Sequence, residues 1–323
     1  MTQLCTEDVG APPGVECARP KVAILLGTFR GEQYLAEQLS SFAAQTHSNW
    51  EVWASDDGST DNTLEILERF KREWPAGRLS IQAGPAKGFV ANFLALTCNP
   101  NIQANFYAYA DQDDVWEADK LGRALQWLES VPANVPALYC ARTRLVDSDN
   151  QDIGFTPLFG NPCFANALVQ SIAGGNTMVF NNAARALLRQ AGTELDVVFH
   201  DWWTYMVVTG CGGHVFFDPV PTLRYRQHGA NVIGGNSSWG ARLQRMRKLW
   251  QGQHRKWNGD NITALRKLES RLTPENRQIL NQFALSREKS LIPRLLHLGR
   301  SGVRRQTLLG NIALFAAAIF NRL

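Results

Sequence analysis

Short apolar runs alternate with helix-like patterns over the first third of the chain. The runs occupy residues 22–26, 50–54, 79–83 and 106–110. Apolar side chains recur at helical spacing between them, as Leu64, Leu67 and Phe70 do after the second run. Strands that alternate with helices form a mostly parallel sheet with helices on both faces. The sequence therefore predicts an α/β fold with a Rossmann-like central sheet.

A cluster of carboxylates follows the fourth apolar run. Asp111, Asp113 and Asp114 lie within four positions, directly after residues 106–110. Carboxylates this close repel one another and need a positive partner, which a hard divalent cation supplies together with substrate phosphates. The cluster therefore predicts an enzyme that acts on a phosphorylated donor.

Polar residues also follow the first two apolar runs. Arg30 comes after the first run, and Asp56 and Asp57 close the second. Ligands of parallel α/β sheets bind beyond the carboxyl ends of the strands. We therefore expect these residues to share one site with the acidic cluster at 111–114.

Charge is distributed unevenly along the 323 residues. Residues 1–236 contain 16 Lys and Arg and 25 Asp and Glu, a net of −9, whereas residues 237–323 contain 17 and 4, a net of +13. Such asymmetry predicts that the basic segment meets an anionic surface, either a membrane or a nucleic acid. The acidic front part and the lack of a helix-turn-helix, zinc or RNP pattern oppose the second choice. We therefore expect no nucleic-acid partner.

The C-terminal residues 308–320 form a 13-residue stretch with Asn311 as its only polar residue, preceded by Arg300, Arg304 and Arg305. Such a stretch can lie in a membrane interface but is shorter than the ~18 residues that span a bilayer. The six cysteines show no CxxC pair, and no secretory signal is expected at the N-terminus. We predict a cytoplasmic protein, peripherally associated with the inner face of the cytoplasmic membrane. A packed helical hairpin or a dimer interface would also explain the stretch.

Four motifs occur in a fixed order along the chain. They are Gly-Thr-Phe-Arg at 27–30, Gln-Thr-His-Ser-Asn-Trp-Glu at 45–51, Ser-Asp-Asp-Gly-Ser-Thr-Asp at 55–61 and Asp-Gln-Asp-Asp at 111–114. Together they resemble the nucleotide-binding half of glycosyltransferase family 2, which has the GT-A fold.

The resemblance implies a division of the chain. Residues 1–20 would be a flexible tail, and 21–235 a GT-A domain with a nucleotide-binding half at 21–120 and an acceptor half at 121–235. Residues 236–323 would form a basic helical region that associates with the membrane.

Three segments are similar to the rhamnosyltransferase-like branch of this family. They are Asp-Gln-Asp-Asp-Val-Trp at 111–116, His-Asp-Trp-Trp at 200–203 and Tyr-Arg-Gln-His-Gly-Ala-Asn at 225–231. The branch builds bacterial surface polysaccharide or lipopolysaccharide. The resemblance implies an inverting enzyme that moves L-rhamnose from dTDP-L-rhamnose to a hydroxyl of a lipopolysaccharide core, an O-antigen or a similar glycan or glycolipid.

Three other functions fit parts of the pattern. The same enzyme class could take a UDP-sugar donor, and a protein without catalysis could bind a sugar nucleotide. A sugar-nucleotide pyrophosphorylase has a related α/β half. It needs a Gly-rich, basic loop after the first strand, and residues 27–32 contain few glycines and the acid Glu32.

By the resemblance, eight residues bind the donor: Thr28, Arg30, Glu32, Asp56, Asp57, Lys87, Asp111 and Gln112. A carboxylate suits this role because the imide N–H of uracil or thymine donates to a charged acceptor. Segment 55–61 is also rich in turn and helix-capping residues, so Ser59 or Asp61 could simply cap the next helix.

The resemblance assigns a divalent cation, Mg²⁺ or Mn²⁺, to Asp113 and Asp111, with His228 closing over the diphosphate or the metal. Such a cation acts as a Lewis acid at the leaving group. Asp201 occupies the position of the catalytic base. Many relatives have Glu-Asp where this chain has His200-Asp201, so His200 could be a proton partner, a core histidine or a residue that tunes Asp201.

The acceptor sugar is assigned to a set of glycines and large side chains: Trp116, Gly174, Gly175, Asn176, Trp202 and Trp203. Flat tryptophan faces pack on sugar C–H bonds, and paired glycines permit close approach of the backbone. The alternatives are a tight turn at 174–175 and a core position for the tryptophans.

Overall fold

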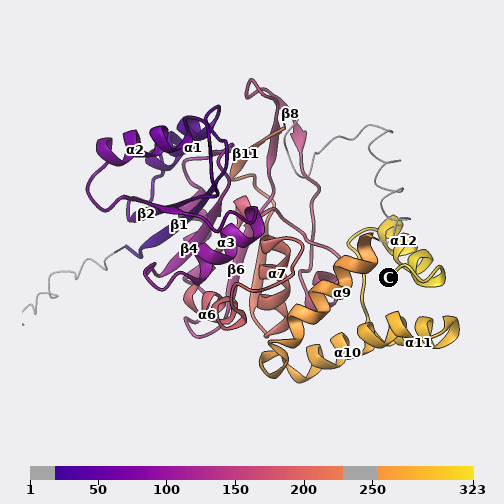
Figure 1. The fold of residues 1–323 in the computed structure, drawn as a ribbon. Coiled ribbons are helices and arrows are strands. Elements are labelled where there is room, and N and C mark those ends of the chain that lie inside the picture. The colour runs from indigo at the N-terminus through magenta and orange to yellow at the C-terminus, as the bar shows by residue number, and fades with distance from the viewer. Residues whose placement is uncertain (1–18, 228–252) are drawn as a thin grey trace, which may run out of the picture.

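The computed structural model describes residues 19–227 and 253–323 (Figure 1). A seven-stranded sheet with the order β10-β6-β9-β4-β1-β2-β3 forms its centre. The strands are β1 Val22–Thr28, β2 Trp50–Asp56, β3 Leu79–Ala83, β4 Phe106–Ala110, β6 Ala137–Ala141, β9 Val179–Asn181 and β10 His214–Asp218. This confirms the predicted α/β fold, and the four apolar runs are β1 to β4.

The sheet is mixed because β9 runs antiparallel to both of its neighbours, β4 and β6. The other neighbouring pairs, β1 with β2, β1 with β4, β2 with β3 and β6 with β10, are parallel. The carboxyl ends of β1, β2 and β4 therefore meet at one edge. In the register of the sheet, Thr28 lies opposite Asp56, and Leu26 lies opposite Ala110, the residue before Asp111.

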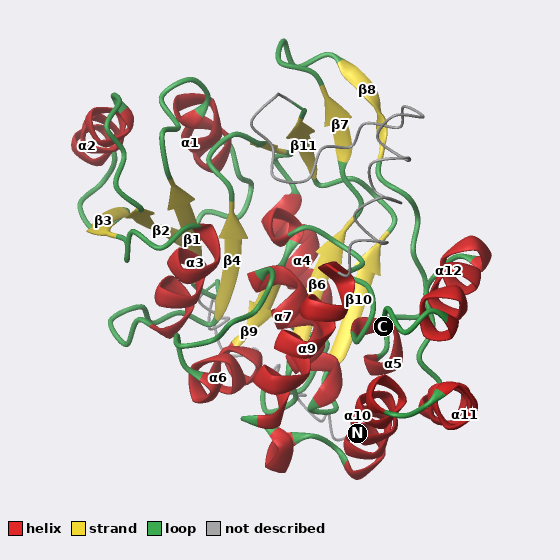
Figure 2. Cartoon of the chain, turned by 45° about the vertical axis from the view of Figure 1, so that its right-hand side comes forward, coloured by secondary structure: helices red, strands yellow, loops and turns green. Residues whose placement is uncertain are grey.

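Alternate residues of each strand point to opposite faces of the sheet, so each face has its own apolar core. Helices cover both faces. Ile24 of β1 belongs to one core and its neighbour Leu25 to the other. The Ile24 side is covered by α1 Leu35–Ala43, α2 Thr63–Glu73 and α4 Lys120–Leu128. The Leu25 side is covered by α3 Phe89–Cys98, α5 Phe164–Ala167, α6 Asn182–Ala191 and α7 His200–Gly210 (Figure 2).

A second, four-stranded sheet lies beside the first, with the order β5-β11-β7-β8. Its strands are β5 Val115–Trp116, β7 Arg144–Val146, β8 Asp152–Phe155 and β11 Leu223–Arg226. β5 starts directly after Asp114, so this sheet holds the far end of the acidic segment.

The C-terminal region is helical: α9 Gln253–Arg266, α10 Pro274–Glu288, α11 Leu291–Ser301 and α12 Leu308–Ile319. Leu265, Leu280 and Phe283 from α9 and α10 belong to the same core as α7, so these helices pack on the sheet domain. Within the described ranges, no helix is both long and apolar enough to cross a membrane.

Candidate active site

Asp56, the last residue of β2, anchors the loop that follows. Its carboxylate accepts hydrogen bonds from the hydroxyls of Thr28 (2.9 Å) and Ser59 (2.6 Å) and from the amides of Gly58 (3.2 Å) and Ser59 (2.8 Å). Four donors occupy both carboxylate oxygens. Asp56 therefore joins the ends of β1 and β2 and shapes the loop.

Asp57 fixes the loop that leads to α3. Its two oxygens accept from the amides of Ala86 and Gly88, each at 2.7 Å. The exposed Lys87 lies between these two anchored residues. Asp57 thus sets the backbone that carries Lys87, an exposed residue.

Glu32 and Arg30 lie on the loop between β1 and α1. Glu32 accepts from the Asn62 amide (3.1 Å) and side chain (2.9 Å) at the start of α2, so its carboxylate ties two loops together. The backbone amide of Arg30 donates to Ser59 Oγ (2.8 Å). Arg30 itself is an exposed residue.

Gln112 links the acidic segment to the loop after β1. Its side chain accepts from the Phe29 amide (2.8 Å) and donates to the Phe29 carbonyl (2.9 Å). A Cβ on Gly31 would lie 2.3 Å from Gln112 Oε1, so a larger residue there would displace the Gln112 amide. Both polar atoms of Gln112 are used by the backbone, which makes it a support for this loop.

Burial and mutual repulsion both act on the acidic cluster. Burial raises the pKa of Asp111 to about 7, and repulsion from Asp113 and Asp201 adds to the shift while Lys120 opposes it. Asp114 is 1% exposed, and burial followed by the charges of Asp113 and Asp111 raises its pKa well above the usual value. Asp201 is therefore close enough to Asp111 for the two charges to interact.

Lys120 is the cation beneath this cluster, and the sequence interpretation missed it. It is fully buried; its ammonium group donates to the Asn176 carbonyl and lies 4.0 Å from the centre of the Trp116 ring. Burial lowers the pKa of Lys120 to about 7, against the attraction of Asp114 and Asp111. Lys120 lies one helical turn before the buried Ala124, and residues four apart share a helix face. This spacing could have predicted that Lys120 is buried.

Asp201 lies in the first turn of α7 and faces the loop at 174–177. Its carboxylate accepts from the amides of Gly175 (3.0 Å) and Trp202 (2.6 Å). Burial raises the pKa of Asp201 to about 6, and these backbone hydrogen bonds reduce the shift. A carboxylate with this pKa is ionised at neutral pH and still basic enough to accept a proton from a reacting hydroxyl.

His200 is a core histidine. It is 5% exposed and stacks on Phe93 with ring centres 3.9 Å apart. Neither ring nitrogen has a hydrogen-bond partner among the described residues, and burial lowers the pKa of His200 to about 3. The imidazole is therefore neutral and packs below the Gly175 backbone.

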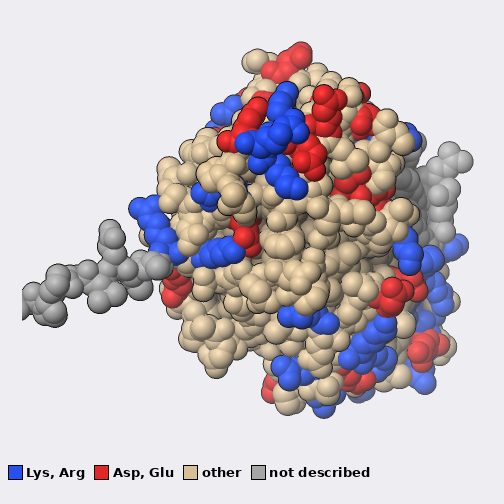
Figure 3. Space-filling view, turned by 60° about the vertical axis from the view of Figure 1, so that its left-hand side comes forward, with Lys and Arg blue, Asp and Glu red and all other residues tan. Residues whose placement is uncertain are grey.

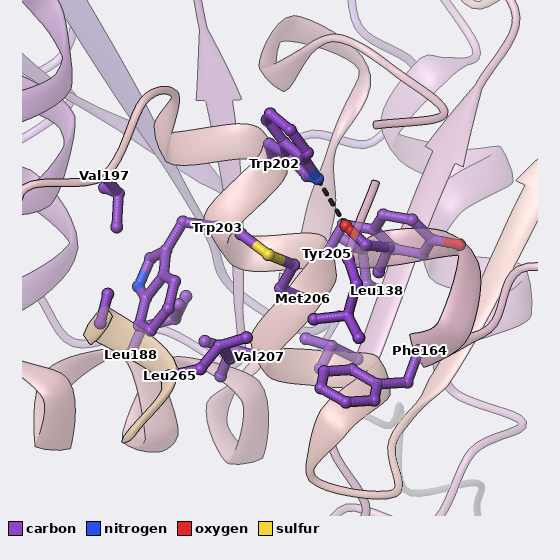
Figure 4. Packing of buried hydrophobic residues seen from close by; sticks show 14 of the residues in the cluster. Leu138, Phe164, Leu188, Val197, Trp202, Trp203, Tyr205, Met206, Val207 and Leu265 are labelled. Atoms are coloured by element: carbon purple, nitrogen blue, oxygen red, sulfur yellow. Dashed lines mark hydrogen bonds between the residues drawn. The ribbon is translucent and has the colours of Figure 1, made fainter. Parts of the chain in front are cut away.

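The three tryptophans assigned to the acceptor are core residues, so we withdraw that assignment. Trp203 is fully buried among Leu188, Val197 and Leu265 (Figure 4). Trp202 is 5% exposed and donates from its indole N–H to the Ala167 carbonyl (2.6 Å). Trp116 is 3% exposed and packs edge-on against Phe42. None of these rings offers an open face to a sugar.

The loop at 174–176 joins the two acidic parts of the site. Gly174 begins it, the Gly175 amide bonds Asp201, and Asn176 Nδ2 donates to Asp114 at 2.6 Å. The sequence placed Gly174, Gly175 and Asn176 at the acceptor; in the structure Gly175 and Asn176 connect the carboxylates.

His228 lies outside the described residues, but the chain just before it reaches the acidic cluster. Arg226 is 2% exposed; it donates to the Asp113 carbonyl (3.2 Å) and the Ser148 carbonyl (2.8 Å) and pairs with Glu37. Arg226 thereby holds the acidic segment against β11.

The described residues contain no group of three or more His, Cys, Asp or Glu side chains that could hold a metal ion alone. Asp111 and Asp113, two carboxylates separated by one residue, suit Mg²⁺, which uses one or two carboxylates plus substrate phosphates and waters. The raised pKa of Asp111 shows that its surroundings would favour added positive charge. The residues present therefore suit a cation that arrives with a diphosphate.

A family model, "Glycosyl transferase family 2", matches residues 23–185. The chain belongs to this family. The matched range includes β1 to β4 and the whole acidic cluster and ends before Asp201.

The chain is similar to one curated protein and to two solved structures whose names mention different sugar nucleotides or sugars. A Shigella flexneri protein called dTDP-rhamnosyl transferase RfbG is 29% identical over 252 residues, which cover 74% of this chain and 83% of that protein. The Pyrobaculum calidifontis mannosyltransferase PcManGT, solved with GDP-Man and Mn²⁺, aligns with a TM-score of 0.51 at 16% identity over 95% of this chain and 86% of its own. Staphylococcus aureus TarS 1-349, solved with UDP-GlcNAc, aligns with a TM-score of 0.52 at 15% identity over 93% of this chain and 90% of its own. These two structures confirm the GT-A fold.

Proposed function

We propose that this glycosyltransferase moves L-rhamnose from dTDP-L-rhamnose to a hydroxyl of a bacterial cell-surface glycan, such as a lipopolysaccharide core or O-antigen, with inversion at the anomeric carbon. The donor is supported by the relative named as a dTDP-rhamnosyl transferase. The chemistry is supported above all by one observation: neighbouring residues of one loop bond the two acidic parts of the site, Gly175 to Asp201 and Asn176 to Asp114.

Asp201 is the base in this proposal. Its carboxylate takes the proton of the acceptor hydroxyl as that oxygen bonds to the anomeric carbon, and the bond from this carbon to the nucleoside diphosphate breaks on the opposite face. The Gly175 and Trp202 amides hold the carboxylate in place for the proton transfer. Positioning of this kind contributes much of the rate in two-substrate reactions.

Asp111 and Asp113, joined by His228, would hold Mg²⁺ or Mn²⁺ together with the donor diphosphate. When bound, the cation neutralises charge on the departing nucleoside diphosphate. Arg30 and Lys87, whose backbones are fixed and whose side chains are exposed, are the cations that can reach the nucleotide. Thr28, Glu32, Asp56, Asp57 and Gln112 shape the loops around it.

The acceptor in this proposal is a glycan or glycolipid at the inner face of the cytoplasmic membrane. With the tryptophans buried, the loop at Gly174–Asn176 beside Asp201 remains as the acceptor border. On the face drawn in Figure 3, Lys and Arg side chains are intermixed with Asp and Glu, which suits a small anionic ligand better than a long nucleic acid.

A thermal-shift panel with dTDP, UDP, GDP and CMP, each with and without Mn²⁺, tests the donor site. A ligand at 100 times its Kd stabilises the folded protein by about 2.7 kcal/mol. We expect a Mn²⁺-dependent shift with dTDP that Asp113→Ala removes and the exposed control Asp119→Ala keeps. A larger shift with UDP would retain the enzyme class and refute rhamnose from dTDP. The absence of any shift would contradict the proposed function.

A further inference from the structure

The outer faces of α11 and α12 are apolar and exposed. On α12 the exposed fractions are 77% for Leu308, 79% for Leu309, 56% for Ile312, 47% for Phe315 and 50% for Ile319. On α11 the exposed large apolar residues are Leu291, Ile292 and Leu296. Figures 1 and 2 place both helices at the edge of the molecule, on the side away from β2 and β3. We call these eight residues the apolar face.

The exposed residues of α12 lie along one side of the helix. Leu308, Ile312, Phe315 and Ile319 follow the spacing of a single helical stripe. Leu314 and Ala318 lie on the other side and are buried in the core of the domain. The helix is therefore anchored by one side, and no other part of residues 19–227 and 253–323 covers its apolar side. A contiguous exposed patch of this kind marks an interaction site.

The positive charge around the apolar face indicates an anionic partner. Residues 289–323 contain six Lys and Arg and no Asp or Glu. Lys289, Arg300 and Arg322 among them are exposed. A symmetric dimer through this face would bring two positively charged segments together. Anionic lipid headgroups instead supply the opposite charge, and the acyl region accepts the apolar side chains.

The length of α12 determines its orientation on a bilayer. Its 12 residues extend ~18 Å, which is less than the ~30 Å hydrocarbon core of a bilayer. A helix of this size with one apolar side lies in the plane of the interface.

The segment before α12 is attached to the chain that leads into the active site. Arg305 donates to the Val169 carbonyl (3.1 Å), the Gln306 amide donates to Gln170 Oε1 (3.0 Å), and Asn166 donates to the Arg304 carbonyl (3.0 Å). Residues 166–170 continue directly into the loop at 174–176 beside Asp201. The apolar face is thus fixed relative to the acceptor side of the site.

We propose that the apolar face of α11 and α12 docks on an anionic phospholipid surface and holds the acceptor loop next to a membrane-bound acceptor. The docking follows from exposure, charge and length alone. Only the identity of the acceptor rests on the proposed function.

Co-sedimentation of the full chain with vesicles tests the docking. The vesicles are phosphatidylcholine with or without phosphatidylglycerol. The variant Leu308→Gln/Ile312→Gln/Phe315→Gln removes apolar contact at exposed positions. The matched control Ile153→Gln/Leu158→Gln changes two residues of similar exposure, 55% and 59%, outside the apolar face.

We expect the wild-type chain and the control to bind phosphatidylglycerol vesicles, and the triple variant to bind about a hundredfold more weakly. Arg300→Gln/Arg322→Gln should weaken binding to anionic vesicles and reduce its dependence on salt. Unchanged vesicle binding by the triple variant would overturn the proposal. So would a wild-type chain that ignores vesicles and forms a dimer that the triple variant abolishes in analytical ultracentrifugation.

Nucleotide binding provides the separate readout. All variants should keep the Mn²⁺-dependent thermal shift with dTDP, because none of the changed residues lies near the acidic cluster. A chain that binds vesicles but no nucleotide would support docking and contradict the proposed function; the reverse result would refute docking alone.

Discussion

The backbone amide of Gly175 donates a 3.0 Å hydrogen bond to the carboxylate of Asp201. The next residue, Asn176, donates from its side chain to Asp114 and accepts from Lys120 on its carbonyl. One short loop therefore supports both the proposed base and the acidic cluster. A change in this loop should alter the distance between the acceptor hydroxyl and the donor diphosphate.

Replacement of Asp201 by Asn should remove transfer and keep donor binding. The amide cannot accept a proton, and general-base catalysis contributes on the order of 10²–10⁴-fold to a rate. We expect kcat to fall about 10³-fold while the Kd for dTDP with Mn²⁺ stays within a factor of about three. Steady-state kinetics and calorimetry measure the two quantities. Asp119→Asn, at an exposed carboxylate, is the control; near-normal kcat in Asp201→Asn would rule out the base assignment.

The pH dependence of kcat should report the pKa of Asp201. Burial raises this pKa to about 6, so the base is ionised above this pH and protonated below it. Activity is then flat above pH ~6.5 and falls about tenfold per unit below pH ~5.5. The measurement is a kcat profile at saturating donor and metal. A profile that stays flat down to pH ~4.5 would mean that another group takes the proton.

Binding of Mn²⁺ to the protein at saturating dTDP should also depend on pH. The pKa of Asp111 is raised to about 7, so a proton competes with the cation below this value. We expect the affinity to rise by up to about tenfold per unit until pH ~7 and then to level off. Titrations followed by electron paramagnetic resonance measure it. Asp111→Asn should flatten the curve, and a pH-independent affinity in the wild-type chain would exclude Asp111 as the ligand.

Lys120 and Asp114 should be coupled energetically through Asn176. Lys120 and Asp114 each bond Asn176, and removal of one leaves a buried polar group without its partner, which costs about 1–3 kcal/mol. We expect Lys120→Met and Asp114→Asn to lower the free energy of unfolding separately. The double variant should be more stable than the sum predicts by about 2 kcal/mol.

Urea denaturation of the four proteins in this cycle gives the coupling. The control cycle pairs Lys120→Met with Asp152→Asn, whose carboxylate side chain is 58% exposed. In the control cycle, the two changes in the free energy of unfolding should add within about 0.5 kcal/mol. If the changes for Lys120→Met and Asp114→Asn add equally well, these two residues are not coupled.

The sequence predicted the parts of this molecule that depend on local pattern. Runs such as 106–110 identified strands, and carboxylates after them identified the edge of the sheet where the site lies. The antiparallel β9 was not predictable, because strand direction depends on long-range pairing. The sequence left open whether Trp202 and Trp203 bind a sugar or lie in the core, because a helix that is buried on nearly all sides has no stripe to mark its inner face.

Site roles were predicted less well than site positions. Asp56 and Asp57 lie at the expected edge, yet their oxygens accept hydrogen bonds from nearby hydroxyl and amide groups. Gln112 likewise uses both polar atoms on the Phe29 backbone. Three of the four donors to Asp56 come from Gly58 and Ser59, in the segment that the sequence marked as turn-rich. The partners of Asp57 and Gln112 lie 29 to 83 residues away, so they leave no mark in a local motif.

Gly175→Ala offers a direct test of the shared loop. A Cβ at this position would lie 2.5 Å from His200 Nε2 and 3.3 Å from Asp201 Cβ, so the loop or α7 must move. Overpacking of this kind costs about 1–3 kcal/mol in stability. A displacement of ~1 Å at a reacting group can cost about 10²-fold in rate, so we expect kcat to fall by that order while donor affinity changes little.

The matched control is Gly160→Ala, where an added Cβ meets no atom within 4 Å. It should leave kcat and Tm unchanged. A crystal structure of Gly175→Ala should show the hydrogen bond from residue 175 to Asp201 lengthened or lost. If kcat stays normal despite that loss, the Gly175 amide does not position the base, and the 174–177 loop serves the fold alone.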